Sequence, residues 1–221
     1  MKIEKISTKT MRGQVYDQLK KKITSAEIYP GQIMTLQGLA NEFGVSLMPV
    51  REALWQLESE KVIVIQSNKR IFVNVMTQKD MEEAIEIRMV LESRAVERSC
   101  ERIDDSGLSK IKHILDSMEA SIDKPKKYIS LNSQFHSAIC SFADSPMLIQ
   151  IIDSLWARIG PYLYLAGEKT GDQSYPMECH RHIYEGFVEK DKKKLKKWLY
   201  EDLKWAADFT VPYLEKGGDG E

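Results

Sequence analysis

The residues that favour β-strands gather in one short part of the chain, and this distribution restricts the fold more than any other feature. The runs VIVI (62–65) and RIFVNV (70–75) are rich in β-branched residues, and the polar segment QSNK between them predicts a β-hairpin. From Thr77 onward the sequence holds no comparable run, and apolar residues recur at helical spacing instead. The chain is therefore predicted to be mainly α-helical, with its strands confined to the first third.

The segment before the hairpin predicts three short helices. In MRGQVYDQLKKKITS (11–25) the apolar residues recur at helical spacing, and the Pro-Gly pair of YPGQ then ends that helix. LQGLANEF (36–43) predicts a second helix, which Gly44 would end. Ser46 is a good N-cap for a third helix that continues through VREALWQLESE (50–60). Three helices followed by a hairpin are the plan of a winged helix-turn-helix.

Amphipathic helices are predicted after the hairpin at about 79–102, 107–122, 126–143, 146–165, 176–189 and 191–213. Thr77 is the expected N-cap of the first of them. We therefore expect a winged helix-turn-helix over residues 1–76 and an all-α antiparallel helical bundle over 77–216. The remainder, 217–221, is expected to be a flexible tail.

The composition indicates a cytoplasmic globular protein. Hydrophobic residues make up 43% of the chain and charged residues 29%, and no window approaches the roughly 18 uninterrupted apolar residues of a membrane-spanning helix. The first residues carry no apolar core of a secretory signal. The three cysteines are widely spaced, which fits free thiols in a reducing compartment.

Charge is distributed unevenly along the chain. Residues 1–75 carry 11 Lys and Arg against 7 Asp and Glu, a net charge of +4, whereas the remainder carries 21 against 26, a net charge of −5. A basic front on an acidic body suggests that only the front meets a polyanion such as DNA.

The third helix has one apolar side and one side suited to a DNA groove. The major groove admits an α-helix, and an arginine there can bind guanine or a phosphate. The hairpin tip would place two cations where a wing touches the DNA backbone or minor groove. The alternative is a solvated basic face on a small α+β domain. The candidate DNA-binding residues are Ser46, Met48, Arg51, Glu52, Trp55, Lys69 and Arg70.

Several polar residues of the helical half fall on apolar faces. Asn132 and His136 lie together beside one apolar stripe, and His180 shares a face with apolar residues of another helix. Asp202 interrupts a third stripe, where a carboxylate is costly unless it is paired or coordinated, and Arg88 interrupts a fourth. These positions suggest a polar cavity inside the bundle. The alternative is a set of satisfied core groups, with Arg88 paired to Asp202.

The segment 29–75 resembles the DNA-binding domain of GntR-family bacterial transcription regulators. That family shares a Pro-Gly turn, a leucine-alanine helix, the motif GVSRTPVREAL, and a Leu-Glu segment before a two-stranded wing. Here the motif reads GVSLMPVREAL (44–54), and the other parts occur around it in the same order as in the family. Leu47 and Met48 replace the usual Arg and Thr, Gln37 replaces a frequent Arg, and Arg70 replaces a wing Gly. These departures alter the expected operator contacts.

The second half resembles the FCD-type ligand-binding domain of the FadR subfamily, through IEIRMVLESRAVE (85–97), LNSQFHSAIC (131–140) and CHRHIYEGFVEKD (179–191). In metal-containing members one Asp or Asn and three His hold a divalent ion beside a small organic acid. The resemblance implies zinc, nickel or manganese at Asn132, His136, His180 and Asp202, with Asp202 in place of the third His. It also implies that Arg88 faces a carboxylate effector, and Tyr162 and Tyr164 are candidates for the same pocket.

These observations predict a homodimeric transcription regulator, most simply a repressor of a catabolic operon. It would bind a pseudo-palindromic double-stranded DNA operator and sense a small carboxylate. One alternative is a metal-dependent hydrolase, although the sequence holds no HExxH motif, nucleophile elbow or phosphate loop, so an enzyme is not expected. The other is a DNA-binding protein whose bundle is a metal-free dimerisation scaffold.

Overall fold

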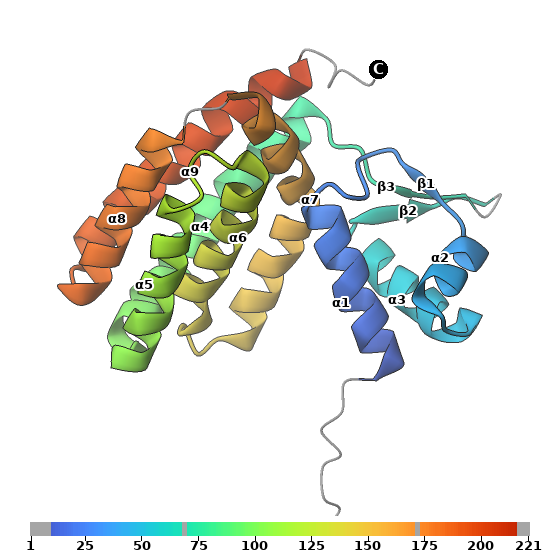
Figure 1. The fold of residues 1–221 in the computed structure, drawn as a ribbon, viewed down its shortest axis with the longest axis horizontal. Coiled ribbons are helices and arrows are strands. Elements are labelled where there is room, and N and C mark those ends of the chain that lie inside the picture. The colour runs from blue at the N-terminus through green and yellow to red at the C-terminus, as the bar shows by residue number, and fades with distance from the viewer. Residues whose placement is uncertain (1–9, 68–69, 171–172, 216–221) are drawn as a thin grey trace, which may run out of the picture. The chain divides into compact units, whose positions relative to one another are not determined.

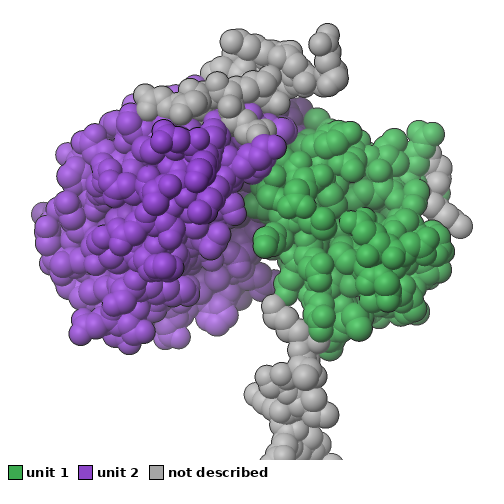
Figure 2. Space-filling model, viewed as in Figure 1, with its two compact units in different colours: residues 1–75 green, residues 76–221 purple. Residues whose placement is uncertain are grey.

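The computed structural model describes residues 10–67, 70–170 and 173–215. The chain divides into two compact units, Met1–Val75 and Met76–Glu221 (Figure 2). The division falls one residue before the boundary that the sequence suggests. The expected tail, 217–221, lies outside the described residues.

The first unit combines short helices with a small antiparallel sheet (Figure 1). Its helices are α1 (Met11–Thr24), α2 (Leu36–Phe43) and α3 (Leu47–Ser59). Strands β2 (Ile63–Ile65) and β3 (Ile71–Val73) form the predicted hairpin, with Val64 opposite Phe72. A further strand, β1 (Ile33–Met34), pairs with the other edge of β3, which gives the order β1-β3-β2. The sequence patterns did not predict β1.

Local chemistry sets the ends of these helices. The hydroxyls of Thr10 and Thr35 accept hydrogen bonds from backbone N–H groups in the first turns of α1 and α2. Gly44 ends α2 in the left-handed conformation, at φ 64°, where a side chain would be strained. The buried residues of α1 and α3 face one another and make the core of this unit. They are Val15, Leu19, Ile23, Val50, Ala53, Leu54 and Leu57.

The second unit is a helical bundle, as predicted. Its helices are α4 (Gln78–Arg102), α5 (Asp105–Glu119), α6 (Pro125–Ser141), α7 (Pro146–Thr170), α8 (Ser174–Val188) and α9 (Lys192–Glu215). The expected ranges differ from these by a few residues, and the largest difference is at α7, which continues past residue 165 through the segment GEKT. Among the described residues, no helix combines the length and apolarity that a membrane span requires.

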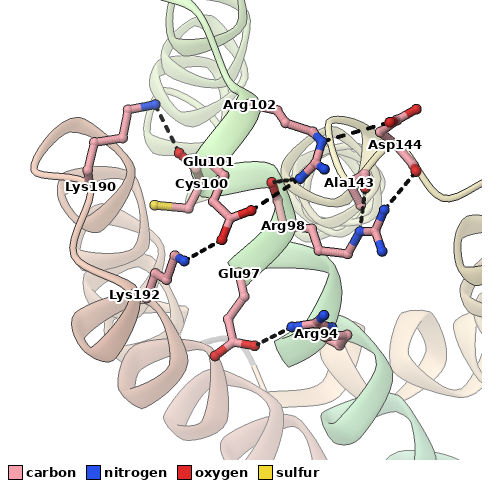
Figure 3. Close-up of polar contacts among 10 residues, drawn as sticks. All are labelled: Arg94, Glu97, Arg98, Cys100, Glu101, Arg102, Ala143, Asp144, Lys190 and Lys192. Atoms are coloured by element: carbon pink, nitrogen blue, oxygen red, sulfur yellow. Dashed lines mark hydrogen bonds and ion pairs between the residues drawn. The ribbon is translucent and has the colours of Figure 1, made fainter.

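Helix α4 is the central element of the bundle, since it packs against α6, α7 and α9. It begins with a capping box in which Thr77 and Asp80 each accept a backbone N–H of the other. Near its other end, Arg98 donates to the carbonyl of Ala143 at 2.7 Å, at the turn between α6 and α7. On the opposite flank, Lys192 pairs with Glu101 (Figure 3). The turn between α6 and α7 and the start of α9 therefore both hold α4 in place.

Candidate nucleic-acid interface and candidate metal centre

The outward side of α3 carries the residues expected there. Leu47, Met48 and Trp55 expose 38%, 58% and 56% of their surface, and Arg51 is exposed as well, whereas Glu52 is half-buried. The opposite side of the same helix is buried in the core of the first unit. One short helix therefore both completes the core and presents an arginine with exposed apolar neighbours.

Ser46 stands directly before α3, as its N-cap position requires, but its side chain accepts no capping hydrogen bond from the described residues. Together with Leu47, Met48, Arg51 and Gln37, it lines a shallow hollow at the start of the helix. The exposed Ser46 hydroxyl, next to the backbone N–H groups of a helix N-terminus, suits a phosphate group.

The predicted wing is only partly described. The backbone N–H of Gln66 donates to the carbonyl of Arg70 at 2.9 Å, which continues the hairpin towards its tip. Arg70 is exposed, and Lys69 lies outside the described residues.

Inside the second unit, the structure brings together polar residues from separate helices. His136 of α6 and His180 of α8 each place Nε2 3.1 Å from a carboxylate oxygen of Asp202 on α9. These side chains are almost fully buried, with exposed fractions of 1%, 0% and 6%. The ligating atoms of the three residues lie within 4.8 Å of one another.

Glu92 of α4 is the centre of the adjoining contacts, and the sequence reading did not include it. One carboxylate oxygen accepts from Arg88 Nε at 2.5 Å and from Trp156 Nε1 at 2.9 Å, and the other lies 2.9 Å from His136 Nδ1. The Arg88 guanidinium also stacks on the Trp156 ring, 3.8 Å from its centroid. Glu92 lies four residues after Arg88 on the same inward face of α4, and this spacing could have indicated it as a partner of Arg88.

Charge accumulates in this interior. Burial raises the pKa of Glu92, but the positive charges of Arg88 and His136 outweigh burial and lower the pKa to about 2. Burial also raises the pKa of Asp202, yet His180 and His136 hold it well below its usual range. Burial lowers the pKa of His136, whereas the charge of Glu92 and the contact with Asp202 raise it, and the net shift is upward. Two ionised carboxylates beside the imidazoles favour a cation at this place.

The donor atoms fit a divalent metal ion. Nε2 of His136, Nε2 of His180 and Oδ1 of Asn132 are buried and have no hydrogen-bond partner of suitable geometry among the described residues. The Nδ1 atoms point elsewhere, His136 towards Glu92 and His180 towards the Tyr128 hydroxyl at 3.4 Å. A proton on each Nδ1 leaves Nε2 available to a metal, and a hydrogen bond from the other ring nitrogen commonly orients metal-ligating histidines in this way. Two imidazoles, one carboxylate and one amide oxygen suit zinc, nickel or manganese.

A small cavity of about 30 Å³ adjoins these donors. Arg88, Asn132, His136 and Asp202 are among its lining residues, and Nη2 of Arg88 is buried there without a hydrogen-bond partner among the described residues. This volume holds an ion or one or two waters. A small organic acid therefore needs side chains to move before it can enter.

Other expectations for the cavity do not match the structure. Tyr162 is buried, but its hydroxyl accepts from the backbone N–H of Met76 at 2.8 Å, and Tyr164 is half-buried. Neither tyrosine is among the described residues that line the cavity. The direct pair of Arg88 with Asp202, expected for a metal-free scaffold, is also wrong, because Arg88 pairs with Glu92 and Asp202 contacts the two histidines.

A winged helix-turn-helix unit, followed by a helical bundle with a buried polar site, defines a two-domain DNA-binding regulator. Residues 11–73 match the family model described as bacterial regulatory proteins, gntR family, and residues 83–204 match the FCD domain. The FCD match alone covers more than half of the chain, so the chain belongs to the FCD-containing GntR-family regulators. The predicted family and fold are confirmed, and the protein is a transcription regulator rather than an enzyme.

Relatives of known name agree with this assignment. The chain is 28% identical to the HTH-type transcriptional regulator McbR of Escherichia coli, over 77% of this chain and 76% of McbR. It is 28% identical to the gluconate operon transcriptional repressor of Bacillus licheniformis, over 84% of this chain and 79% of that protein. Among solved structures, E. coli McbR/YncC superposes with a TM-score of 0.84 at 24% identity, covering 95% of this chain and 99% of that one. The last comparison supports the fold.

Proposed function

We propose that this regulator is a cytoplasmic, homodimeric repressor of a catabolic operon, which binds a pseudo-palindromic operator and releases it in response to a small organic acid. The observation that carries the sensing part is the set of buried atoms of His136, His180 and Asn132 that face the cavity region without a hydrogen-bond partner of suitable geometry among the described residues. The name of the gluconate operon repressor, a relative over most of its length, supports control of a catabolic operon.

The metal site of the proposed sensor consists of His136, His180, Asp202 and the amide oxygen of Asn132. The bound ion supplies positive charge that attracts a carboxylate. Glu92 holds the His136 ring and the Arg88 guanidinium in place, which leaves Nη2 of Arg88 to donate to that carboxylate. Asp202 stands where the family has a third histidine, so it adds a negative charge that strengthens retention of a cation.

Effector binding changes the bundle because the cavity is too small for an organic acid. To admit one, side chains that line the cavity must move, and the effector then stabilises the arrangement of the bundle in which they have moved. Such a ligand alters DNA affinity only if it binds the two arrangements with different affinity.

The DNA-reading part of the proposal assigns roles to exposed residues at the start of α3 and to its N-cap residue. Arg51 binds a guanine edge or a phosphate, and the Ser46 hydroxyl binds a phosphate. Leu47 and Met48 contact thymine methyl groups, since apolar side chains suit that feature of the major groove. Glu52 and Trp55 lie further along the same side, and Lys69 and Arg70 contact the DNA backbone beside the recognition helix.

Gel-shift titration tests the DNA-reading part. The probe is a duplex from the region upstream of the protein's own gene, shortened to the protected site. Replacing thymine by deoxyuridine in that site removes only methyl groups, and we expect it to weaken wild-type binding and to have little further effect on the double variant Leu47→Ala/Met48→Ala. Arg51→Ala should weaken binding by about 1–3 kcal/mol. If the protein causes no specific gel shift of this duplex at moderate salt, the proposed operator binding is wrong.

Metal analysis of the purified protein tests the sensor. We expect about one divalent ion per chain, lost in His136→Ala and in His180→Ala. His113→Ala is the matched control, because His113 is an exposed histidine of α5. Equal metal content in all variants would reject the site and leave the metal-free scaffold.

A further inference from the structure

The outer face of α4 carries a narrow stripe that nothing in its own unit covers among the described residues. Glu83, Ile87, Val90 and Arg94 recur at spacings of four, three and four residues, so they share one line along the helix. Val90 exposes 69% of its surface, Ile87 42%, and the Arg94 side chain 63%. Two β-branched apolar residues this exposed at the centre of a helix face indicate a contact surface.

A neighbouring helix runs alongside this part of α4. Lys192 pairs with Glu101 and Lys196 with Glu97, so α9 runs antiparallel to α4. Continued by one turn, the same register brings Tyr200, which is 50% exposed, to the level of residues 93 and 94.

The order of charges along the stripe indicates that its partner is a second copy of this chain. Read from the N-terminal end, the stripe is acidic, apolar, apolar and basic. If a second identical helix lies against it in the antiparallel direction, Ile87 meets Val90 of the second copy, and Glu83 meets Arg94 of the second copy. A two-fold axis between residues 87 and 90 produces both pairs twice, which is the self-complementarity that a symmetric dimer interface requires.

The ion pair that Arg94 makes within its own helix leaves it available to such a partner. Its contact with Glu97 is 3.4 Å long and exposed (Figure 3). Glu97 also pairs with Lys196 at 3.0 Å. Exposed ion pairs of this kind are worth little, so Arg94 can turn from Glu97 to an acidic partner at small cost.

We propose that the stripe Glu83-Ile87-Val90-Arg94 of α4 is the centre of the interface between two copies of this chain, paired antiparallel about a two-fold axis. This inference rests on the proposed homodimer and names the surface that forms it. The apolar pair supplies the association energy, and the charge pairs set the direction and register of the two helices.

Analytical ultracentrifugation of the full-length protein at low ionic strength tests the apolar part. We expect Val90→Glu to raise the dimer dissociation constant by at least about tenfold, because each dimer buries two such substitutions. Val188→Glu is the matched control, since Val188 is 51% exposed at the end of α8, and it should leave the constant unchanged. Equal effects of the two substitutions would overturn the proposal.

Charge reversal tests the direction of pairing without altering the apolar centre. Glu83→Arg and Arg94→Glu each create like-charge pairs, and we expect each to weaken the dimer roughly three- to tenfold, less at high salt. Combining them restores opposite charges, so the double variant should return within about twofold of wild type. Weakening in both single variants without recovery in the double would overturn the antiparallel pairing.

These measurements separate the interface from the proposed function. A wild-type protein that is dimeric, while Val90→Glu and both charge reversals leave it unchanged, overturns the stripe and leaves the dimeric repressor intact. A wild-type protein that is monomeric at every concentration overturns both. Circular dichroism checks that the variants fold. If Val90→Glu does not fold, the charge-reversal variants still test the proposed interface.

Discussion

Glu92 contacts more of the buried site than any residue that the sequence patterns singled out. Its carboxylate accepts from Arg88 and Trp156 and faces Nδ1 of His136, and its exposed fraction is 0%. A buried carboxylate with three polar neighbours orients them all, because each neighbour would otherwise lose a polar partner in a place that water does not reach. In the proposed sensor, one side chain thus positions both a metal ligand and the residue that receives the effector.

Replacement of Glu92 by Gln should weaken metal binding although no proposed ligand is removed. The amide keeps the shape of the carboxylate but loses its charge, so it holds the His136 ring and the Arg88 guanidinium less firmly. We expect zinc affinity, measured by competition with a chelating dye, to fall roughly 10- to 100-fold. Glu97→Gln is the control, because Glu97 lies on the same helix and pairs with Lys196 instead. Unchanged affinity in Glu92→Gln would show that Glu92 only fills space.

At the scale of elements, the close fit of helices is visible only in three dimensions. Gly107 is the third residue of α5, and a Cβ there would lie 2.6 Å from Ile103 and 2.7 Å from the ring of Phe142. Gly13 holds the same place in α1, and the nearest atom to its Cβ would be the Thr10 hydroxyl oxygen at 3.4 Å. Both glycines donate their N–H to the N-cap side chain. The two positions therefore differ mainly in the room around them.

Gly107→Ala should destabilise the helical unit, although alanine normally favours a helix. Overpacking against Ile103 and Phe142 costs about 1–3 kcal/mol, which exceeds the gain of up to about 1 kcal/mol in helix propensity. Urea unfolding followed by circular dichroism measures the difference. Gly13→Ala should be neutral or slightly stabilising, and a stabilised Gly107→Ala variant would contradict the packing argument.

Elements that depend on local chemistry could be predicted from the sequence, and those that depend on distant contacts could not. The periodicity of α4 and its Thr77 cap are local, whereas β1 has only two residues and exists through pairing with β3, about forty residues later. His136, His180 and Asp202 could be anticipated because each interrupts an apolar face. Tyr162 gave no comparable signal, since only the fold reveals that its hydroxyl binds Met76.

At the scale of the whole molecule, the two units have separate hydrophobic cores. The large core cluster runs from Met76 to Leu203 and lies within the helical unit. The core of the first unit is made by α1, α3 and the small sheet. Ligands of the buried site lie within the second unit alone, so a bound metal stabilises that unit directly. Thermal unfolding should therefore show two transitions that respond differently to metal.

Removal of metal should lower the melting temperature of the helical unit and leave that of the DNA-binding unit nearly unchanged. Zinc at one hundred times its dissociation constant adds about 2.7 kcal/mol to the stability of a unit that binds it only when folded. For a unit of this size, that corresponds to a shift of roughly 5–10 °C. Differential scanning calorimetry with zinc and after chelation measures the shift, and His180→Ala should abolish it while His113→Ala should not. A shift of the same size in both transitions would show that zinc acts outside the His136, His180 and Asp202 cluster, because that cluster has no ligand in the first unit.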